Sequence, residues 1–451
     1  MRLTWTASTA LLLLWGVFFL ELKVLLALGI LLSVALILTS LAQQHRLDKI
    51  GVLVLANMLF WLASGFSVGA ISLSSFVNPR FYEGDGRVFI ALIPLLLFCI
   101  TPVSIWEFKR IQKHILFISV SSILIYLFWL ITHTPLLSGT GHLDEFHGFL
   151  TSHTGSGTFF GTFAAFMVAY AAEKRKPWLL VMSFLLLGPV FSSGSREAML
   201  GVAAVLAWYW GLKRKHVKPL IAVAVLVLVA LPFTSKMDNK SYNRNIAIFN
   251  AEQVEAVISQ TQAGIRSDWV MGDWTASSNN ENLESGDVTS LVRIMLWVYA
   301  TKRLIESPVF GMGWGRFNDL YLVMSNTRLS SLAVGGQQVF SAASAHNSYF
   351  QLLAETGLIG FGLYFSVWIW IYLRSLKAEK LFKHIQSVRA YYVGCQALVV
   401  YILVCALTGH ALAAPSVMLP VVTILGVGLA FYRSSLKVSS PNSKTQTREE
   451  T

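Results

Sequence analysis

Apolar runs separated by short polar segments make up most of this chain. Many of the runs are long enough to cross a bilayer, and together they predict about twelve helices. Their approximate ranges are 4–20, 24–42, 50–73, 88–106, 115–133, 156–172, 178–193, 197–212, 219–234, 347–373, 390–410 and 416–432. Lipid cannot satisfy the polar groups of an open backbone, so only helices suit these runs. The pattern therefore predicts an all-α polytopic membrane protein.

One polar interruption, 235–345, is far longer than the others and sets the organisation of the chain. The expected units are the first nine transmembrane helices in 1–234, a large outward loop with helical segments in 235–345, the last three transmembrane helices in 346–434 and a disordered tail in 435–451. Within the loop, a helical stretch near 288–306 is expected to precede Pro308 and the glycines of 311–315. The chain shows no internal repeat of the kind that is common in transporters.

The composition and the placement of charge agree with a membrane protein. Of the 451 residues, 55% are hydrophobic and 13% are charged, and the mean hydropathy is +0.60. The net charge of +12 would by itself suggest a nucleic-acid partner, but the basic residues alternate from loop to loop. One set of loops, together with the two ends of the chain, holds 22 of the 35 Lys and Arg residues. By the positive-inside rule this side is cytoplasmic, both termini lie inside, and the charge requires no nucleic acid.

The segment Ala345–Gly360 starts a long apolar helix but carries His346, Asn347, Gln351 and Glu355 into it. Residues 347, 351 and 355 are four apart and therefore share one helical face. Polar groups in a spanning helix are costly, so a line of them indicates function. A histidine that caps the helix at the lipid interface is the simpler alternative. At about 1.5 Å per residue, Glu355 lies about 13 Å beyond His346, which favours a structural role for Glu355.

Three arginines, Arg80, Arg87 and Arg196, lie in short loops on the side that the charge bias leaves poor in basic residues. Arginine binds phosphate through two parallel hydrogen bonds, and Arg196 begins a predicted helix, where anions are favoured. Pairing with neighbouring carboxylates is the alternative. Along a helix Glu197 would point away from Arg196, which favours function for Arg196. Arg293, on the helical stretch of the large loop, is a further candidate, with a solvated helical face as the alternative.

A histidine and several arginines on the outer side suggest a lipid substrate whose leaving group is a phosphate or diphosphate. His346 would take the proton of an acceptor hydroxyl as that hydroxyl attacks an anomeric carbon. The arginines would stabilise the charge that grows on the departing diphosphate. A lipid-linked glycan transporter is the rival class. It would be expected to carry ionisable residues within several spans, and most spans here have none.

This scheme needs neither a metal nor another cofactor. The outward segment 134–155 holds three histidines and two carboxylates, but their spacing matches no standard metal motif. The three cysteines all lie in apolar runs and give neither a metal-binding pattern nor a disulfide framework. We therefore expect no metal site and no cofactor.

Three motifs resemble those of the bacterial O-antigen ligase and polymerase superfamily. They are the histidine motif His346–Gly360, the large-loop motif that runs from Arg293-x-x-x-Trp297 through Ser307-Pro308 and the glycines to Phe317, and the upstream arginine motif Ser193–Arg196. The resemblance covers roughly 190–365 by motif and the whole chain by topology. Together the three motifs are specific, whereas each alone would be weak.

The resemblance implies a metal-independent, inverting glycosyltransferase of the GT-C type in the bacterial inner membrane, with its active site in the periplasm. Its donor would be a glycan on undecaprenyl diphosphate, and membrane lipids would surround it. The family's roles carry onto His346 as the group that activates the acceptor, and onto Arg196 and Arg293 as diphosphate ligands. Arg87 is a looser match. Asn347 and Gln351 would support the histidine.

The acceptor distinguishes three activities within this resemblance. It is lipid A-core in an O-antigen ligase, a second lipid-linked repeat unit in a polymerase, and a serine or threonine in a protein O-glycosyltransferase. The last kind usually has a larger C-terminal region than this chain. We favour the ligase, with the repeat-unit polymerase as the alternative.

Overall fold

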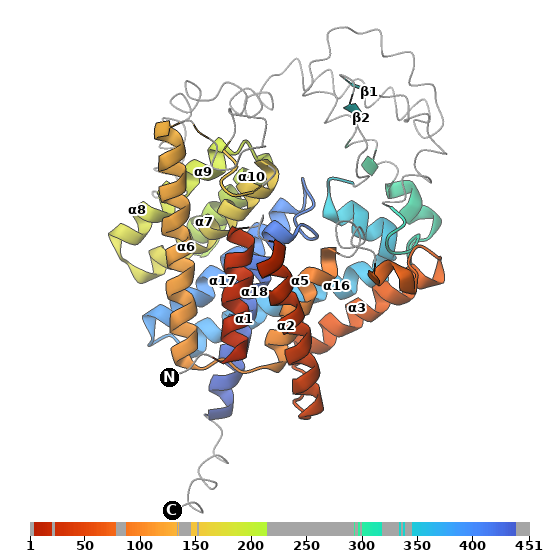
Figure 1. Cartoon of the computed structure of the whole chain (residues 1–451), viewed down its shortest axis with the longest axis horizontal. Helices are drawn as coiled ribbons and strands as arrows, with labels where there is room; N and C mark the ends of the chain where they lie inside the picture. The colour runs from red at the N-terminus through yellow and green to blue at the C-terminus, as the bar shows by residue number, and fades with distance from the viewer. Residues whose placement is uncertain are drawn as a thin grey trace, which may run out of the picture.

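The structure, a computed structural model, describes residues 4–19, 23–77, 87–132, 134, 146–150, 153–213, 293, 296, 297, 300–317, 333, 334, 337, 338 and 345–438. Within these residues the fold is helical, apart from a short antiparallel pair formed by β1 (Ala333–Val334) and β2 (Gln337–Gln338). Figure 1 shows the helices packed into one bundle, with the start of α1 and the end of α18 at the same end. The predicted all-α fold class is confirmed.

The helices follow the apolar runs in chain order. The first part of the chain forms α1 (Trp5–Phe18), α2 (Lys23–Ala42), α3 (Lys49–Ser67), the 3₁₀ turn η1 (Leu73–Val77), α5 (Arg87–Ile100), α6 (Ile105–Thr132), α7 (His153–Lys174), α8 (Pro177–Leu185), α9 (Leu187–Ser192), α10 (Arg196–Leu206) and the π-helical η2 (Ala207–Lys213). The last part forms α16 (Ser348–Leu381), α17 (Gln386–Cys405) and α18 (Pro415–Val438). The predicted run 219–234 lies outside the described residues.

Polar residues at the helix starts explain several of these boundaries. Asp48 Oδ1 accepts a hydrogen bond from Ile50 N at the start of α3 (3.0 Å), and Ser195 Oγ accepts one from Ala198 N at the start of α10 (3.4 Å). Pro177 begins α8, where its missing N–H costs nothing. Local sequence therefore sets where the apolar runs become helical.

Several predicted boundaries are wrong, among them the start of α6, which is Ile105 rather than a residue near 115, and another of them matters for the site. The run 390–410 was expected to be one helix, but α17 ends at Cys405 and a chain of turns follows up to Pro415. The apolar composition continues through the helix and the turns alike, so hydropathy does not reveal the end. Similarly, α3 ends at Ser67 rather than near residue 73.

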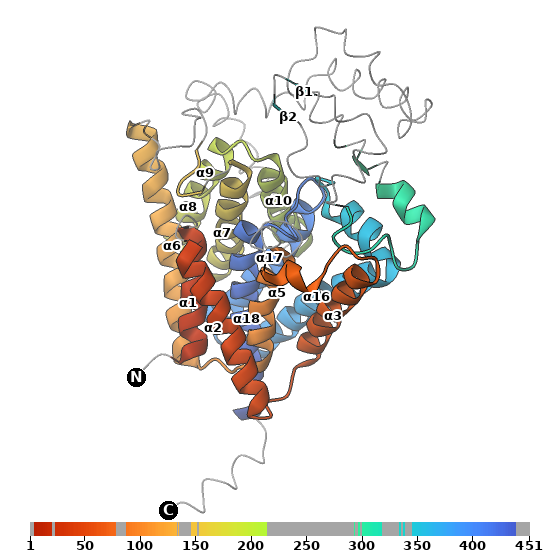
Figure 2. The ribbon, with the colours of Figure 1, turned by 45° about the vertical axis from the view of Figure 1, so that its right-hand side comes forward.

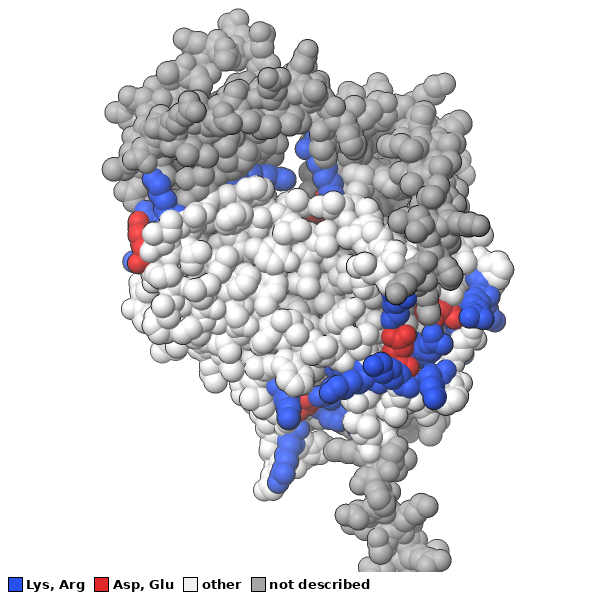
Figure 3. All heavy atoms as spheres, turned by 180° about the vertical axis from the view of Figure 1, so that it is seen from behind, with Lys and Arg blue, Asp and Glu red and all other residues white. Residues whose placement is uncertain are grey.

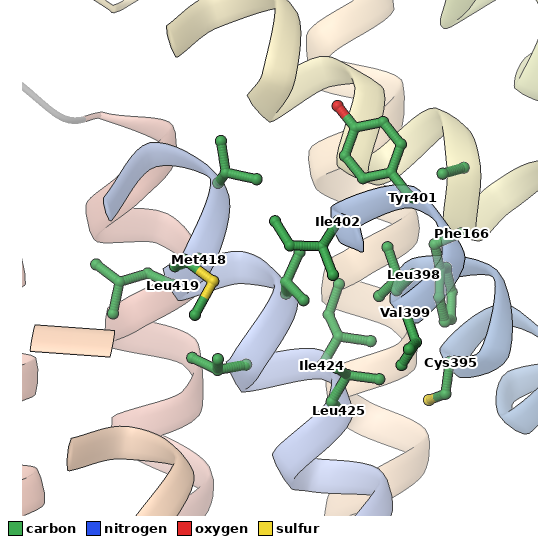
Figure 4. Close-up of a cluster of buried hydrophobic side chains, with 14 of the residues drawn as sticks. Phe166, Cys395, Leu398, Val399, Tyr401, Ile402, Met418, Leu419, Ile424 and Leu425 are labelled. Atoms are coloured by element: carbon green, nitrogen blue, oxygen red, sulfur yellow. The ribbon is translucent and has the colours of Figure 1, made fainter. Parts of the chain in front are cut away.

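The core of the bundle lies where α7, α17 and α18 meet. Figure 4 shows its interdigitated side chains, which include Phe166 from α7, Ile402 from α17 and Met418 from α18, each at most 2% exposed. Tyr401 is also fully buried, and its hydroxyl donates to Thr158 O (2.9 Å). Burying this polar group with a partner avoids a desolvation cost and fixes α17 against α7.

The outer helices have the surface that a membrane requires. By length and composition, seven of the described helices could cross a membrane: α2, α3, α6, α7, α16, α17 and α18. On α2, Val24, Leu31 and Leu38 are 67%, 65% and 61% exposed, which suits contact with lipid rather than water. Figure 3 shows a broad expanse of the described surface without charged side chains, and the charges gather around its rim. The chain is therefore a multi-pass membrane protein.

Charged side chains meet at the end of the bundle where α1 begins and α18 ends. The ion pairs there are Arg374–Asp48 (3.4 Å), Lys213–Glu379 (2.6 Å) and Arg389–Glu173 (3.1 Å). Arg433 donates to the carbonyl oxygens of Cys99 and Thr101. These seven charged residues are called the paired end below. All four of its basic residues belong to the set that the sequence places on the cytoplasmic side.

Candidate active site

His346 lies at the opposite end of the bundle, immediately before α16. Its φ is +46°, a left-handed conformation that is uncommon for residues other than glycine. The next residue, Asn347, caps the helix: its Oδ1 accepts hydrogen bonds from Tyr349 N (2.9 Å) and Phe350 N (3.2 Å). Capping is therefore done by Asn347 rather than by the histidine. The strained backbone at residue 346 is the kind that persists at functional sites.

The loop between α17 and α18 is held by hydrogen bonds to Ser348, the first residue of α16. Ser348 N donates to Ala406 O (2.9 Å), and Ser348 Oγ donates to Gly409 O (3.0 Å) and accepts from Leu412 N (3.5 Å). Figure 2 shows this loop between α10 and the start of α16. The fastening brings His410 beside His346, with ring centroids 5.2 Å apart and planes at 45°.

Arg293 approaches from the helical stretch of the large loop. Trp297, four residues later on that stretch, donates from Nε1 to Ala345 O (2.7 Å) and stacks on Phe350 with centroids 5.5 Å apart. The predicted Arg293-x-x-x-Trp297 motif therefore anchors its helix to the start of α16 through the tryptophan. Among the described residues, the buried Nε of Arg293 has no hydrogen-bond partner.

Glu197 carries a carboxyl group that acts on Arg293, and burial raises its pKa to about 7. The two side chains interact electrostatically, and Cys405 Sγ donates to Glu197 O (3.2 Å). A Cβ at Gly409 would overlap Glu197 Oε2, so glycine is required where the loop passes the carboxylate. The expectation that Glu197 points away from Arg196 left it without a role. The structure places it against the fastened loop, as the partner of Arg293.

The contacts between the other predicted arginines and His346 are less direct. Arg87 begins α5 and acts electrostatically on His410, so it belongs to the same group of side chains. Arg196 begins α10, next to Glu197, and is half-buried. Arg80 lies outside the described residues. The structure thus gathers His346, Arg293 and Arg87 around His410, and it places Arg196 beside the glutamate that faces Arg293.

Burial sets the protonation of the two histidines. Burial, together with the nearby positive charge of Arg293, lowers the pKa of His346 to about 4. Burial is also the largest cause at His410, and together with His346, Arg87 and Arg293 it lowers the pKa of this residue to about 3. The pKa of Arg293 is lowered by burial, and Glu197 opposes this shift. Both imidazoles are therefore neutral at pH 7, whereas the arginines remain charged.

A cavity of about 50 Å³ lies beside His410, whose ring neighbours that of His346. The side chains that line it include Ser348, Gln351 and Glu355 of α16, Trp61 of α3 and His410. The predicted stripe on α16 therefore does face a common space, although Asn347 at its start is used as the helix cap. The cavity is roomy enough for a few water molecules or for part of a polar ligand.

Glu355 has the structural role that the sequence suggested. Its Oε1 accepts a hydrogen bond from Phe317 N (3.1 Å), and its carbonyl oxygen accepts one from Gly313 N (3.0 Å). Gly311 and Gly357 lie back to back with φ of +72° and +61°, and a Cβ at either would strike the other's backbone segment. The glycine-rich segment thus packs against a kink in α16.

Among the described residues, no group of three or more His, Cys, Asp and Glu side chains could hold a metal ion. Of the outward histidine and carboxylate cluster in 134–155, most members lie outside the described residues. The structure therefore assigns no metal ligands to the residues around His346.

Sequence reasoning missed two residues of the site, Glu197 and His410. The signal for His410 was the Thr408-Gly409-His410 sequence at the outer end of a predicted span, where glycine interrupts the apolar run. The signal for Glu197 was a carboxylate in the first turn of a helix within an apolar region. Neither signal identifies a partner, because the partners come from distant parts of the chain.

Comparison with known proteins agrees with the motifs. No curated protein matches the chain. Residues 181–365 match the family model described as O-antigen ligase. The match includes α10, Arg293, the glycine-rich segment and the first half of α16, and it excludes the loop that carries His410. The resemblance read from the sequence is thus confirmed for this segment of the membrane protein: residues 181–365 are similar to the O-antigen ligase family.

Proposed function

We propose that the protein transfers a glycan from undecaprenyl diphosphate to an acceptor hydroxyl on the periplasmic side of the bacterial inner membrane. The family match supports an enzyme of the O-antigen ligase and polymerase type in general. The observation that carries the finer proposal is the pairing of a neutral His346 with the cationic Arg293 at the end of the bundle opposite the paired end. The favoured acceptor is lipid A-core, and a lipid-linked repeat unit is the alternative.

In this reaction the acceptor hydroxyl attacks the anomeric carbon of the donor. A carbon–oxygen bond forms on one face while the bond to the diphosphate oxygen breaks on the other, so the configuration inverts. His346 takes the proton of the hydroxyl, which a neutral imidazole can do. Arg293, Arg87 and Arg196 would bind the diphosphate and stabilise the charge that it gains on leaving. The scheme needs no metal.

Diphosphate binding also makes His346 a better base. In the free enzyme the charge of Arg293 disfavours a proton on His346. A bound diphosphate would offset that charge and favour the imidazolium that forms during transfer. The base therefore becomes effective when the donor is in place, which would limit deprotonation of stray hydroxyls.

Deletion of the gene followed by gel analysis of surface glycans tests the proposal. Loss of ligase activity removes polymer from the lipid core and leaves it on the carrier lipid. Loss of polymerase activity leaves a single repeat attached to the core. An unchanged glycan profile would contradict both activities. Transfer by the purified enzyme should persist in EDTA, and a loss that a divalent cation restores would contradict the metal-free scheme.

A further inference from the structure

Three of the side chains that line the cavity near His346 bury a polar atom that has no hydrogen-bond partner among the described residues. Trp61 Nε1, Gln351 Oε1 and His410 Nε2 are buried, and none has a hydrogen-bond partner among the described residues. All three residues line the one cavity of about 50 Å³. An unpaired polar atom in a protein interior costs stability, and three around one space indicate that something polar fills it.

The three atoms come from three separately fixed elements. Trp61 of α3 is fully buried and stacks on Trp314, with centroids 5.8 Å apart. His410 is held by the fastening of its loop to Ser348. Gln351 lies one turn into α16. Because these elements are fixed by other contacts, the atoms are held in place without a partner, which is how a pre-organised binding site is built.

The lining has the chemistry of a carbohydrate site. The indole N–H donates, the amide oxygen accepts, and a neutral imidazole Nε2 does one or the other according to its tautomer. A sugar hydroxyl can donate and accept and so can satisfy each of these atoms. Trp61, Trp314 and Tyr364 form an aromatic wall in which Trp61 and Tyr364 have centroids 5.2 Å apart. Apolar ring faces beside a few directed polar groups suit the mixed surface of a pyranose.

We propose that this cavity, lined by Trp61, Gln351 and His410, is a subsite that receives the hydroxyls of a substrate sugar next to His346. The inference rests on the proposed glycan transfer, since it assigns a position to a sugar of the donor or of the acceptor. His410 is then a substrate-binding residue that lies beyond the segment matched by the family model. The site takes one of its determinants from the loop between α17 and α18.

Two variants of His410 separate binding from structure. His410→Phe removes the polar Nε2 and keeps a ring in the same space, whereas His410→Gln keeps an amide nitrogen near the Nε2 position. We would measure KM for undecaprenyl-diphosphate-linked O-antigen and, separately, for lipid A-core, with purified enzyme in detergent. We expect His410→Phe to raise one KM at least tenfold with little loss of kcat, and His410→Gln to restore part of it.

The substrate whose KM rises identifies the sugar in the subsite. A higher KM for lipid A-core places the acceptor sugar there, and a higher KM for the lipid-linked donor places the donor sugar there. If both KM values stay within twofold of wild type while transfer continues, the cavity holds only water and the subsite is wrong. If the wild-type enzyme transfers no glycan to any acceptor, the proposed function itself fails, which is a different result.

Thermal unfolding without substrate provides a second readout. Removing an unpaired buried nitrogen should leave the melting temperature of His410→Phe equal to or above that of wild type. Thr423→Val is the matched control, because the buried hydroxyl of Thr423 on α18 has no hydrogen-bond partner among the described residues and does not line the cavity. The melting temperature of Thr423→Val should likewise equal or exceed that of wild type, and both of its KM values should be unchanged. A lower melting temperature for His410→Phe together with unchanged KM values would mean that His410 is structural.

Discussion

The two ends of the bundle differ in whether their buried charged and polar groups have hydrogen-bond partners. At the paired end, Lys213 and Glu379 lie 2.6 Å apart, and Arg433 donates to two carbonyl oxygens. At the site end, Arg293 Nε and His410 Nε2 are buried, and neither has a hydrogen-bond partner among the described residues. Buried polar groups are thus bonded to one another at one end, whereas at the other end single polar atoms are left without a bond among the described residues.

The difference separates what stabilises the fold from what serves a ligand. Partnered polar groups repay the cost of burial and join helices that are distant in sequence. Unpartnered ones lower stability, and several of them around one space are expected where a substrate supplies the missing bonds. Variants at the paired end should therefore change stability and spare catalysis, and variants at the site end should do the reverse.

The largest expected effect comes from the base and the arginines. His346→Ala should lower kcat by about 10²–10⁴-fold, because general-base catalysis contributes that much. Separately, Arg196→Ala should lower it by about 10²–10³-fold through lost stabilisation of the diphosphate. Single-turnover transfer from labelled lipid-linked glycan measures both. Each variant should still insert and purify normally, and full activity in either would exclude the proposed chemistry.

Gly409→Ala should have the next largest effect on transfer. Its Cβ would overlap Glu197 Oε2, so the loop or the carboxylate must move. Because the loop also carries His410, a displacement of about 1 Å should cost about 100-fold in kcat/KM. Gly362→Ala, at a glycine with open space around it, is the control and should retain wild-type activity. Equal activities in the two variants would show that the approach of the loop to Glu197 is unimportant.

The pH dependence of transfer tests the comparison at His346, the proposed base. His346 must be deprotonated to act, and its pKa is lowered to about 4 from the ordinary value of 6.5. Transfer should therefore persist as the pH falls from 7 to 5 and be lost only as it approaches 4. Arg293 and Arg87 stay charged around the base, and His410 is neutral in this range. Burial raises the pKa of Glu197 to about 7, so this carboxyl group takes up a proton between pH 7 and 5, which disfavours a proton on His346 still more. A pH–rate profile measured at subsaturating donor tests this, and an acidic limb near 6.5 would contradict it.

The smallest effect on catalysis is expected at the paired end. Glu379→Gln removes the charge that holds Lys213, and it also weakens the contact with Gln396. We expect a loss of about 1–3 kcal/mol in stability and a melting temperature lower by a few degrees. Transfer per folded molecule should stay within about twofold of wild type, as expected for a residue far from the chemistry. A large loss of kcat in Glu379→Gln with an unchanged melting temperature would contradict the view that the paired end stabilises the fold and the other end serves catalysis.

The sequence predicted the helices and part of the site because both leave local signals. Hydropathy located the spans, and the motifs around His346 and Arg293 were recognisable by their resemblance to a known family. His410 was not predictable in this way, because Ser348 fixes its loop from 64 residues away in the chain. The apolar run also hid the end of α17 at Cys405. Contacts that join distant segments decide which side chains share a site, and periodicity carries no information about them.

The hydrogen bonds between Ser348 and the loop after α17 also bear on when the protein becomes active. Ser348 belongs to α16, while the residues that it holds come after α17, and Glu197 reaches the same loop from α10. The base, its neighbouring histidine and the arginine partner therefore come together only after α10, α16 and α17 have all packed. Under the proposed function, a chain in which α17 has not yet packed would lack the assembled site and would not cleave the lipid-linked donor.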